Sequence, residues 1–375
     1  MELSISPEDE ALGFKLCDLA ETEYDEGKVM TAGSDEERAF VRLYLDATVA
    51  GTDLVLTSKS YRRAVAIFRK CWWSTHERSA IPQRMDEAAG LVDENLLTYI
   101  KRVADQGVDL RTGEPPAANG LNVRCHQSIE EHATEVLIKV FEDFARCGAI
   151  MVSSEAEGFM TDVQCAPMSR VEKHDDEGFV TAEGRVCYDG RHGGDVSTNA
   201  KTPVTTHPPA CSPTHMALIH YIVWLAVSFP LVDVVFCKRD VKAAFKHVWY
   251  SISDACWFGT KFSLAMFKAA GMPHVIEKWT CAYVLFLVLD FGWTESPSEY
   301  GCFGWAISQA HRSLGPQSRA QLTAVAFFNL VFVDDAAVVE LELFGRGAAS
   351  CDAYDWSLSR ILGKALNLKK LAVEG

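Results

Sequence analysis

The segment that most constrains the fold is an Asp-Asp pair held between two apolar, β-prone arms. It reads Leu330-Val331-Phe332-Val333-Asp334-Asp335-Ala336-Ala337-Val338-Val339-Glu340. Two such arms around a short polar break predict a β-hairpin with both carboxylates at its tip. Adjacent carboxylates repel each other and lose hydration on burial, so they rarely lie inside an apolar hairpin without a cation. Taken alone, the segment fits either a metal-binding hairpin or an exposed turn that uses Asp for its turn propensity.

A second acidic segment favours the metal-binding interpretation. The run from Val232 onward predicts a buried strand that ends in Asp240, and a bulky aromatic, Phe245, follows after two alanines. Two-metal phosphoryl transfer needs carboxylates from separate strands that converge on ions roughly 3.5–4 Å apart. Asp240, Asp334 and Asp335 supply three such groups. The alternative for Asp240 is a helix N-cap, a position that Asp often takes.

The pattern of elements predicts an α+β fold in which helices cover one face of a small antiparallel sheet. Residues 1–120 are expected to form a helical N-terminal region of unknown role, and residues 121–375 a second domain. A capping box at Ser128 to Glu131 predicts a helix start with Ser128 as the N-cap. The other predicted helices are Glu36–Val49, Ser60–Trp73, Thr214–Ser228, Ile276–Thr280 and Ser298–Ser313, and the predicted strands are Phe179–Tyr188, Leu231–Cys237, Val284–Leu289 and Ala324–Val333.

Composition fits a globular chain but argues against strong nucleic-acid binding. Hydrophobic residues make up 48% and charged residues 23%, and the net charge is −15. Phosphate contacts call for Lys and Arg. Residues 1–160 hold 17 basic and 29 acidic side chains, a net of −12, whereas residues 161–375 hold 19 and 22, a net of −3. Any affinity for nucleic acid must therefore come from local patches, most of all in the nearly balanced second half.

The chain ends and the cysteines indicate an intracellular protein that neither enters nor crosses a membrane. The acidic start lacks the basic segment of a signal peptide. The most apolar stretch, Met216–Phe236, carries His220 and is interrupted by Pro230 and Asp233, whereas a membrane span needs about 20 apolar residues in a row. The 12 cysteines are scattered without a Cys-x-x-Cys pair. Such cysteines are typical of small buried side chains in a reducing compartment.

Six segments, in order along about residues 166–370, resemble the motifs of reverse transcriptases. Asp240-x-x-x-x-Phe245 resembles motif A, and Phe332-Val333-Asp334-Asp335 resembles motif C. The segment between them is similar to motif B, which has Phe-Gly, then Ser-Pro, then an aromatic three residues on; here it reads Phe291-Gly292-Trp293-Thr294-Glu295-Ser296-Pro297-Ser298-Glu299-Tyr300. The remaining segments resemble two strands of the fingers and motif D: Ala166–Lys173, Gly184–Arg191 and Leu366–Lys370. The residues of these motifs are most similar to those of enzymes from gypsy-like or DIRS-like retroelements.

The resemblance implies a right-hand polymerase with palm and fingers, which extends a primer on an RNA or DNA template with deoxynucleoside triphosphates. It implies two Mg²⁺ or Mn²⁺ ions held by Asp240, Asp334 and Asp335, with the backbone carbonyl of Val241 completing one coordination shell. It also implies that Phe245 is a steric gate against ribonucleotides and that Arg185 clamps the triphosphate, with Lys173 as a second phosphate ligand. Gly292 and Ser296 would let the template and primer approach the backbone closely. Lys370 would donate a proton to pyrophosphate. For Phe245 a core role, and for Lys173 and Lys370 a merely solvated role, stay open.

Three departures from the family pattern leave alternative functions open. Residues 1–120 match no motif of the family, and Lys370 lies so near the end of the sequence that a thumb is expected to be absent. No ribonuclease H, integrase or Asp-Thr/Ser-Gly protease motif is recognised. The chain is therefore expected to be a truncated retroelement polymerase, or alternatively a non-catalytic remnant that binds nucleic acid or a partner. A viral RNA-dependent RNA polymerase is the third alternative, against which Phe245 and Val333 argue.

Overall fold

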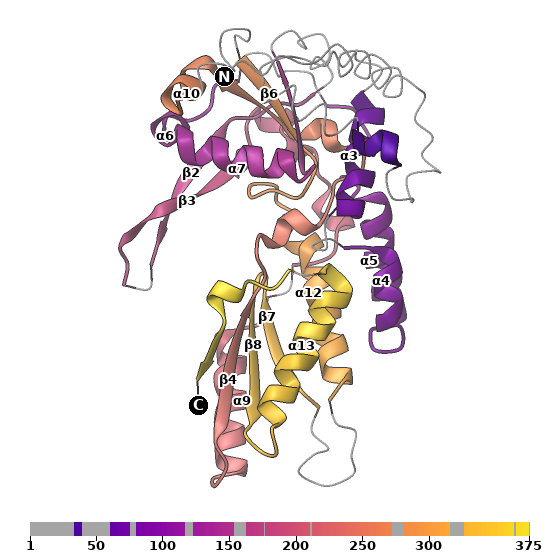
Figure 1. Cartoon of the computed structure of the whole chain (residues 1–375), viewed down its shortest axis with the longest axis vertical. Coiled ribbons are helices and arrows are strands. Elements are labelled where there is room, and N and C mark those ends of the chain that lie inside the picture. The colour runs from indigo at the N-terminus through magenta and orange to yellow at the C-terminus, as the bar shows by residue number, and fades with distance from the viewer. Residues whose placement is uncertain are drawn as a thin grey trace. The chain divides into compact units, whose positions relative to one another are not determined.

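A computed structural model describes the ranges 34–39, 61–75, 80–116, 123–153, 163–175, 177–210, 212–271, 281–315, 326–363 and 365–374. The chain divides into two compact units that alternate along the sequence (Figure 1). Unit 1 comprises Met1–His76, Gln106–Val204 and Trp249–Thr294. Unit 2 comprises Glu77–Asp105, Thr205–Val248 and Glu295–Gly375. The domain boundary near residue 120 stays a prediction. The chain passes from one unit to the other after residues 76, 105, 204, 248 and 294.

Unit 1 is built on a three-stranded antiparallel sheet with the order β1-β6-β5 and on a separate β2–β3 hairpin. Every residue of β6 is buried, as its run Cys-Ala-Tyr-Val-Leu-Phe predicts for a central strand. Phe68 stacks on Phe144 with ring centroids 6.2 Å apart, which joins α3 to α7. The elements of unit 1 are α3 (Tyr61–Thr75), α6 (Gln127–Glu131), α7 (Ala133–Ala145), β1 (Ala149–Ser153), β2 (Met168–His174), β3 (Val180–Tyr188), η6 (Gly194–Val196), α8 (Thr198–Lys201), η9 (Ala255–Trp257), β5 (Gly259–Ser263), α10 (Leu264–Ala269) and β6 (Cys281–Phe286).

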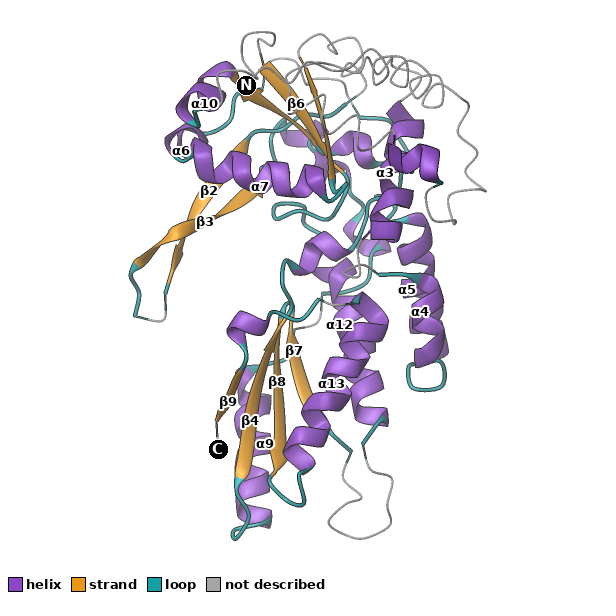
Figure 2. Ribbon diagram, viewed as in Figure 1, coloured by secondary structure: helices purple, strands orange, loops and turns teal. Residues whose placement is uncertain are grey.

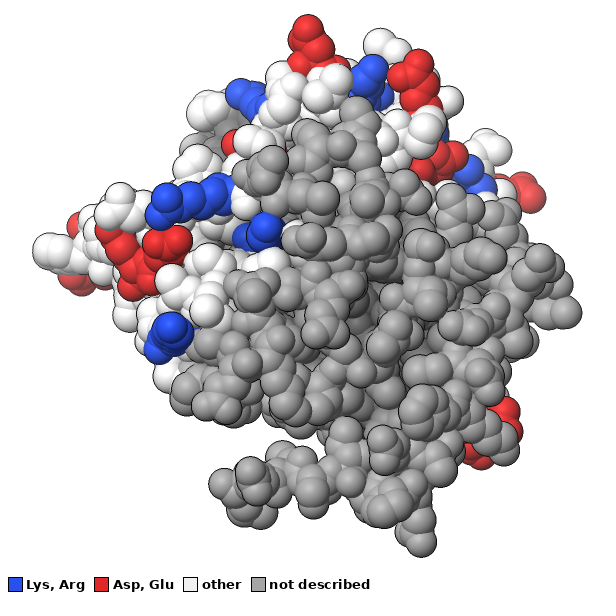
Figure 3. All heavy atoms as spheres, turned by 90° about the horizontal axis from the view of Figure 1, so that it is seen from above, with Lys and Arg blue, Asp and Glu red and all other residues white. Residues whose placement is uncertain are grey.

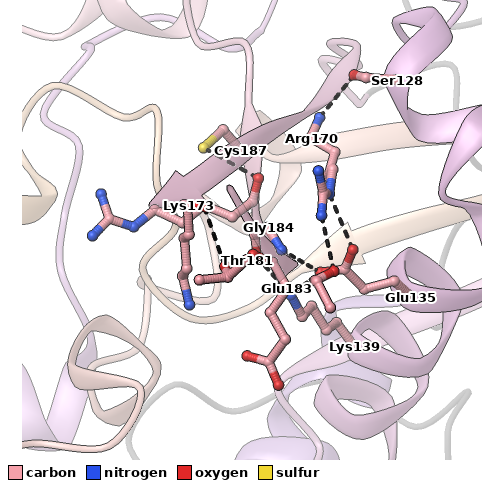
Figure 4. Close-up of polar contacts among 11 residues, drawn as sticks. Ser128, Glu135, Lys139, Arg170, Lys173, Thr181, Glu183, Gly184 and Cys187 are labelled. Carbon is pink, nitrogen blue, oxygen red and sulfur yellow. Dashed lines mark hydrogen bonds and ion pairs between the residues drawn. The ribbon is translucent and has the colours of Figure 1, made fainter. Parts of the chain in front are cut away.

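The hairpin of β2 and β3 is fastened to α7 by the carboxylate of Glu135 (Figure 4). Glu135 accepts hydrogen bonds from Arg170 Nε at 3.0 Å, Lys139 Nζ at 2.6 Å and the backbone N of Gly184 at 2.7 Å. Burial alone would raise the pKa of Glu135, but these hydrogen bonds and the Lys139 charge lower it to about 2. A Cβ at Gly184 would overlap the Arg170 guanidinium, so the contact requires glycine there.

Unit 2 contains a four-stranded antiparallel sheet with the order β7-β8-β4-β9. Helices cover both of its faces (Figure 2). On one face, Glu340 of β8 binds Arg346 of α13 at 2.5 Å, and Asn329 of β7 accepts a hydrogen bond from Ser308 of α12. The elements are α4 (Pro82–Met85), η2 (Asp86–Ala88), α5 (Glu94–Gln106), η7 (Val204–Thr206), α9 (His215–Ser228), β4 (Val234–Asp240), η8 (Ala244–His247), α12 (Ser296–Ser313), β7 (Phe328–Phe332), β8 (Asp335–Leu341), α13 (Arg346–Leu362), η10 (Leu368–Lys370) and β9 (Ala372–Glu374).

The α9 helix covers the second face of this sheet. Leu225 packs with Val339 and Leu341 of β8, and Tyr221 stacks on Phe328 of β7. The prediction of a sheet covered on one face is therefore wrong. The physical reason is that α9 is apolar almost all round, so one of its sides can pack on the sheet although others stay exposed, Val227 at 74%.

The predicted mixed α+β class with small antiparallel sheets is confirmed, and several predicted elements lie where the sequence indicated. Thr214 caps α9 by accepting a hydrogen bond from Ala217 N. Ser128 as a helix N-cap is wrong, because α6 begins at Gln127 and the Ser128 hydroxyl accepts a hydrogen bond from Arg170 N instead. Of Glu36–Val49 only the first residues are described, and Ile276–Thr280 lies outside the described residues. Within the described part of the chain, no helix is both long and apolar enough to span a bilayer.

Candidate active site

The register of unit 2 brings the predicted aspartates to one end of the sheet. β4 and β8 pair antiparallel so that Asp240 stands directly opposite Asp335. The turn between β7 and β8 consists of Val333 and Asp334, and the backbone N of Val241 donates to Asp334 O at 2.8 Å. The strand end and the hairpin tip that the sequence indicated are thus adjacent.

Two non-glycine residues beside these carboxylates have left-handed backbones. Val333 has φ of 57° at the hairpin turn, and Ala243 has φ of 53° shortly after Asp240. A β-branched residue with positive φ is uncommon, because its Cβ crowds the backbone. Such strain persists where the surrounding structure fixes it, and it is concentrated at functional sites.

Asp240 is a fully buried carboxylate whose two oxygens are both engaged by the η10 segment. Its side chain is 1% exposed. Asn367 Nδ2 donates to Oδ1 at 2.5 Å, and Lys370 Nζ donates to Oδ2 at 2.8 Å. The backbone N of Asn367 also donates to Asp240 O at 2.8 Å. A buried carboxylate without partners would be strongly destabilising, and these contacts satisfy both oxygens of Asp240.

The three aspartates and Lys370 interact electrostatically as one cluster. Burial raises the pKa of Asp334, the charges of Asp335 and Asp240 raise it further, and Lys370 opposes them. The hydrogen bond to Asp240 raises the pKa of Lys370, and the charges of all three aspartates act in the same direction. Lys238 Nζ lies 3.3 Å from Asp335 Oδ1 as an ion pair without hydrogen-bond alignment. Negative charge therefore exceeds positive charge at this end of the sheet.

Aromatic side chains from η8 and α12 pack against each other near the cluster. Phe245 is buried and meets the Tyr300 ring edge-on, with centroids 5.7 Å apart. Tyr300 is 1% exposed, and its hydroxyl has no hydrogen-bond partner in the described structure. Burial, and then the charges of Tyr354, Asp334 and Asp240, raise the Tyr300 pKa well above its usual value. The buried Tyr300 hydroxyl is therefore within electrostatic range of Asp334 and Asp240.

The aspartates are oxygen donors of the kind that divalent cations bind, but the described residues do not form a ready-made ion site. Carboxylate oxygens and a backbone carbonyl are the hard ligands that these ions prefer. The buried Tyr300 hydroxyl has no hydrogen-bond partner in the described structure, and Asp335 Oδ1 has the Lys238 ion pair but no hydrogen bond. Among the described residues, no group of three or more His, Cys, Asp or Glu side chains stands ready to hold an ion, and both oxygens of Asp240 are taken by Asn367 and Lys370.

Of the other predicted residues, Ser296 lies in unit 2 and Gly292, Arg185 and Lys173 lie in unit 1. Ser296 is fully buried as the first residue of α12. Arg185 is exposed on β3 with its guanidinium 5.9 Å from the Phe291 ring centroid. Lys173 lies on β2, with its ammonium apart from the Glu135 contacts (Figure 4).

Gly292 has a structural requirement that the sequence did not indicate. Its φ is 121°, and a Cβ there would overlap the carbonyl oxygen of Tyr188 at the end of β3. Asn199 Nδ2 donates to Gly292 O at 2.9 Å, and Asn199 Oδ1 accepts from Thr294 N at 3.0 Å. The backbone that closely approaches Gly292 is thus that of Tyr188, which also belongs to unit 1.

Two residues of the cluster were missed as site residues. Asn367 falls within the motif D segment and Tyr300 is the aromatic of motif B, so both could have been noted, but their contacts with Asp240 and Phe245 join distant parts of the chain. A comparison with protein-family models finds no match for this chain, and a comparison with curated proteins finds none either.

Proposed function

We propose that the chain is a reverse transcriptase-like nucleotidyl transferase, in which unit 2 is the palm and carries the catalytic centre. The observation that carries this proposal is the pairing of Asp240 with Asp335 at the sheet end, next to the Asp334 turn. Carboxylates on a strand end and on a neighbouring hairpin tip can converge on the two ions that two-metal phosphoryl transfer uses. The resemblance of the motifs supports the same conclusion independently of the geometry.

Each residue of the cluster has a role in this reaction. Asp240, Asp334 and Asp335, with the Val241 carbonyl, would hold two Mg²⁺ or Mn²⁺ ions. Bound there, the ions lower the pKa of the primer 3′-hydroxyl and neutralise charge on the leaving pyrophosphate. Lys370, whose pKa is raised by Asp240, stays protonated and can donate a proton to the pyrophosphate. The rigidly packed Phe245 ring would exclude a ribose 2′-hydroxyl by shape.

The proposed substrates are deoxynucleoside triphosphates and a primer on an RNA or DNA template. In unit 1, exposed Arg185 and partly exposed Lys173 remain the predicted triphosphate ligands. Figure 3 shows the described part of one face, where basic and acidic side chains are intermixed. Binding of the nucleic-acid backbone would therefore depend on local contacts and weaken steeply with salt.

Primer extension with the purified protein tests the proposal. Wild type should add deoxynucleotides in the presence of Mg²⁺ or Mn²⁺, and Asp334→Asn should lower the rate by roughly 100-fold or more, because it removes a charge that holds the ions. Asp352→Asn is the matched control, since Asp352 is an exposed carboxylate of α13 outside the cluster. Absence of extension with every template would favour a non-catalytic remnant, and equal use of ribonucleotides would favour an RNA polymerase.

A further inference from the structure

Lys370 supplies a positive charge at the place where a divalent cation would contact Asp240. Its ammonium lies 2.8 Å from Asp240 Oδ2, a distance at which a lysine can satisfy a buried carboxylate directly. Asp240 is 1% exposed, whereas the Lys370 side chain is 57% exposed. The fixed partner is therefore the aspartate, and the movable partner is the lysine.

The backbone around Lys370 is held on β4 from both sides, by Asn367 before it and by β9 after it, whereas the end of the Lys370 side chain is exposed. The η10 segment is anchored on β4 by the two hydrogen bonds from Asn367, one to Asp240 Oδ1 and one to Asp240 O. Lys370 N in turn donates to Asn367 O at 3.0 Å, which fixes the start of its side chain but not its end. A long aliphatic stem with an exposed head can rotate into solvent at little cost in hydration.

We propose that Lys370 is a placeholder cation, which neutralises Asp240 in the metal-free protein and leaves Oδ2 when a divalent ion binds. Asn367 is the positioning residue that keeps Asp240 aimed at the site in both states. The inference rests on the proposed metal centre and deepens it. It explains why Asp240 can stay buried without an ion, and why the described acidic groups do not by themselves form a ready-made cage.

The proposal predicts opposite effects of one substitution with and without metal. Without metal, Lys370→Met leaves a buried carboxylate uncompensated, and the melting temperature should fall by roughly 2–4 °C. With Mn²⁺, the same variant should bind more tightly than wild type, on the order of three- to tenfold, because no ammonium must be displaced. Saturating Mn²⁺ should then restore the melting temperature to that of metal-saturated wild type.

Calorimetric titration with Mn²⁺ and thermal unfolding of the same samples test this. The control is Lys242→Met, which removes an exposed charge close in sequence to Asp240 and should change neither quantity by more than about twofold or about 1 °C. Lower stability of Lys370→Met that Mn²⁺ does not restore, or unchanged Mn²⁺ affinity, would overturn the placeholder role and leave the metal centre standing. No Mn²⁺ binding by wild type or Lys370→Met would overturn both.

Discussion

At the scale of single residues, Asp240 and His311 are buried titratable groups of unit 2 that are satisfied in different ways. Both oxygens of Asp240 accept hydrogen bonds, Oδ1 from Asn367 and Oδ2 from Lys370. His311 stays neutral, because Asn329 Nδ2 donates to its Nδ1 and its Nε2 donates to Ser350 O at 3.1 Å. One group needs a cation or strong donors nearby, and the other needs only a well-oriented polar network.

The buried His311 should make folding stability depend on pH. Burial lowers its pKa from 6.5 to about 4. Below the unfolded value of 6.5 the unfolded chain gains a proton that the folded chain takes up only near pH 4, so stability is present above pH 6.5 and is lost as pH falls. Between pH 7 and pH 5 we expect a loss of about 2 kcal/mol in the free energy of unfolding. Urea denaturation of wild type and His311→Gln measures it, and an equal pH dependence in both would contradict the assignment.

Phe245 should control the choice of sugar if the proposed function holds. We expect Phe245→Ala to relax the preference for deoxynucleotides more than it lowers the rate, because the ring excludes the 2′-hydroxyl and takes no part in the chemistry. The ratio of kcat/KM for a deoxynucleotide and the matching ribonucleotide measures this. Phe245→Tyr keeps the ring and serves as the control. An unchanged ratio in Phe245→Ala would show that Phe245 is only a core aromatic packed on Tyr300.

At the scale of elements, the turn between β6 and α12 depends on one glycine. Gly292→Ala should destabilise unit 1 by roughly 2 kcal/mol or more, because its φ of 121° and the Tyr188 carbonyl exclude a Cβ. Gly301→Ala is the matched change: it lies within α12 and a Cβ there meets nothing within 4 Å. It should stabilise by about 0.5–1 kcal/mol. Thermal unfolding compares the two, and similar effects of both would refute the close packing at Gly292.

The α9 helix offers a second paired test. Leu225 is 2% exposed and packs on β8, whereas Val227 on the same helix is 74% exposed. Leu225→Ala should lower the free energy of unfolding of unit 2 by about 2–5 kcal/mol. Val227→Ala should stay within about 0.5 kcal/mol of wild type. If Leu225→Ala were as mild as Val227→Ala in urea denaturation, α9 would not cover the sheet as described.

At the scale of the whole molecule, local patterns predicted the elements and missed the contacts between distant segments. The Asp-Asp hairpin and the helix near Thr214–Ser228 could be predicted because neighbouring residues determine them. Ser128 was misassigned because Arg170, a distant residue, takes its hydroxyl. Asn367 was missed for the same reason, since its role exists only once η10 lies beside β4. The alternation of two units along one chain likewise has no local signal.

The most direct test of the central claim is an anomalous difference map from a crystal of this protein soaked in Mn²⁺. We expect two peaks roughly 3.5–4 Å apart, contacted by Asp240 and Asp334, with the Lys370 ammonium withdrawn from Asp240 Oδ2. In Asp334→Asn crystals treated alike, at least one peak should be lost. Full Mn²⁺ occupancy elsewhere with none at these aspartates would contradict the assignment of unit 2 as a two-metal catalytic centre.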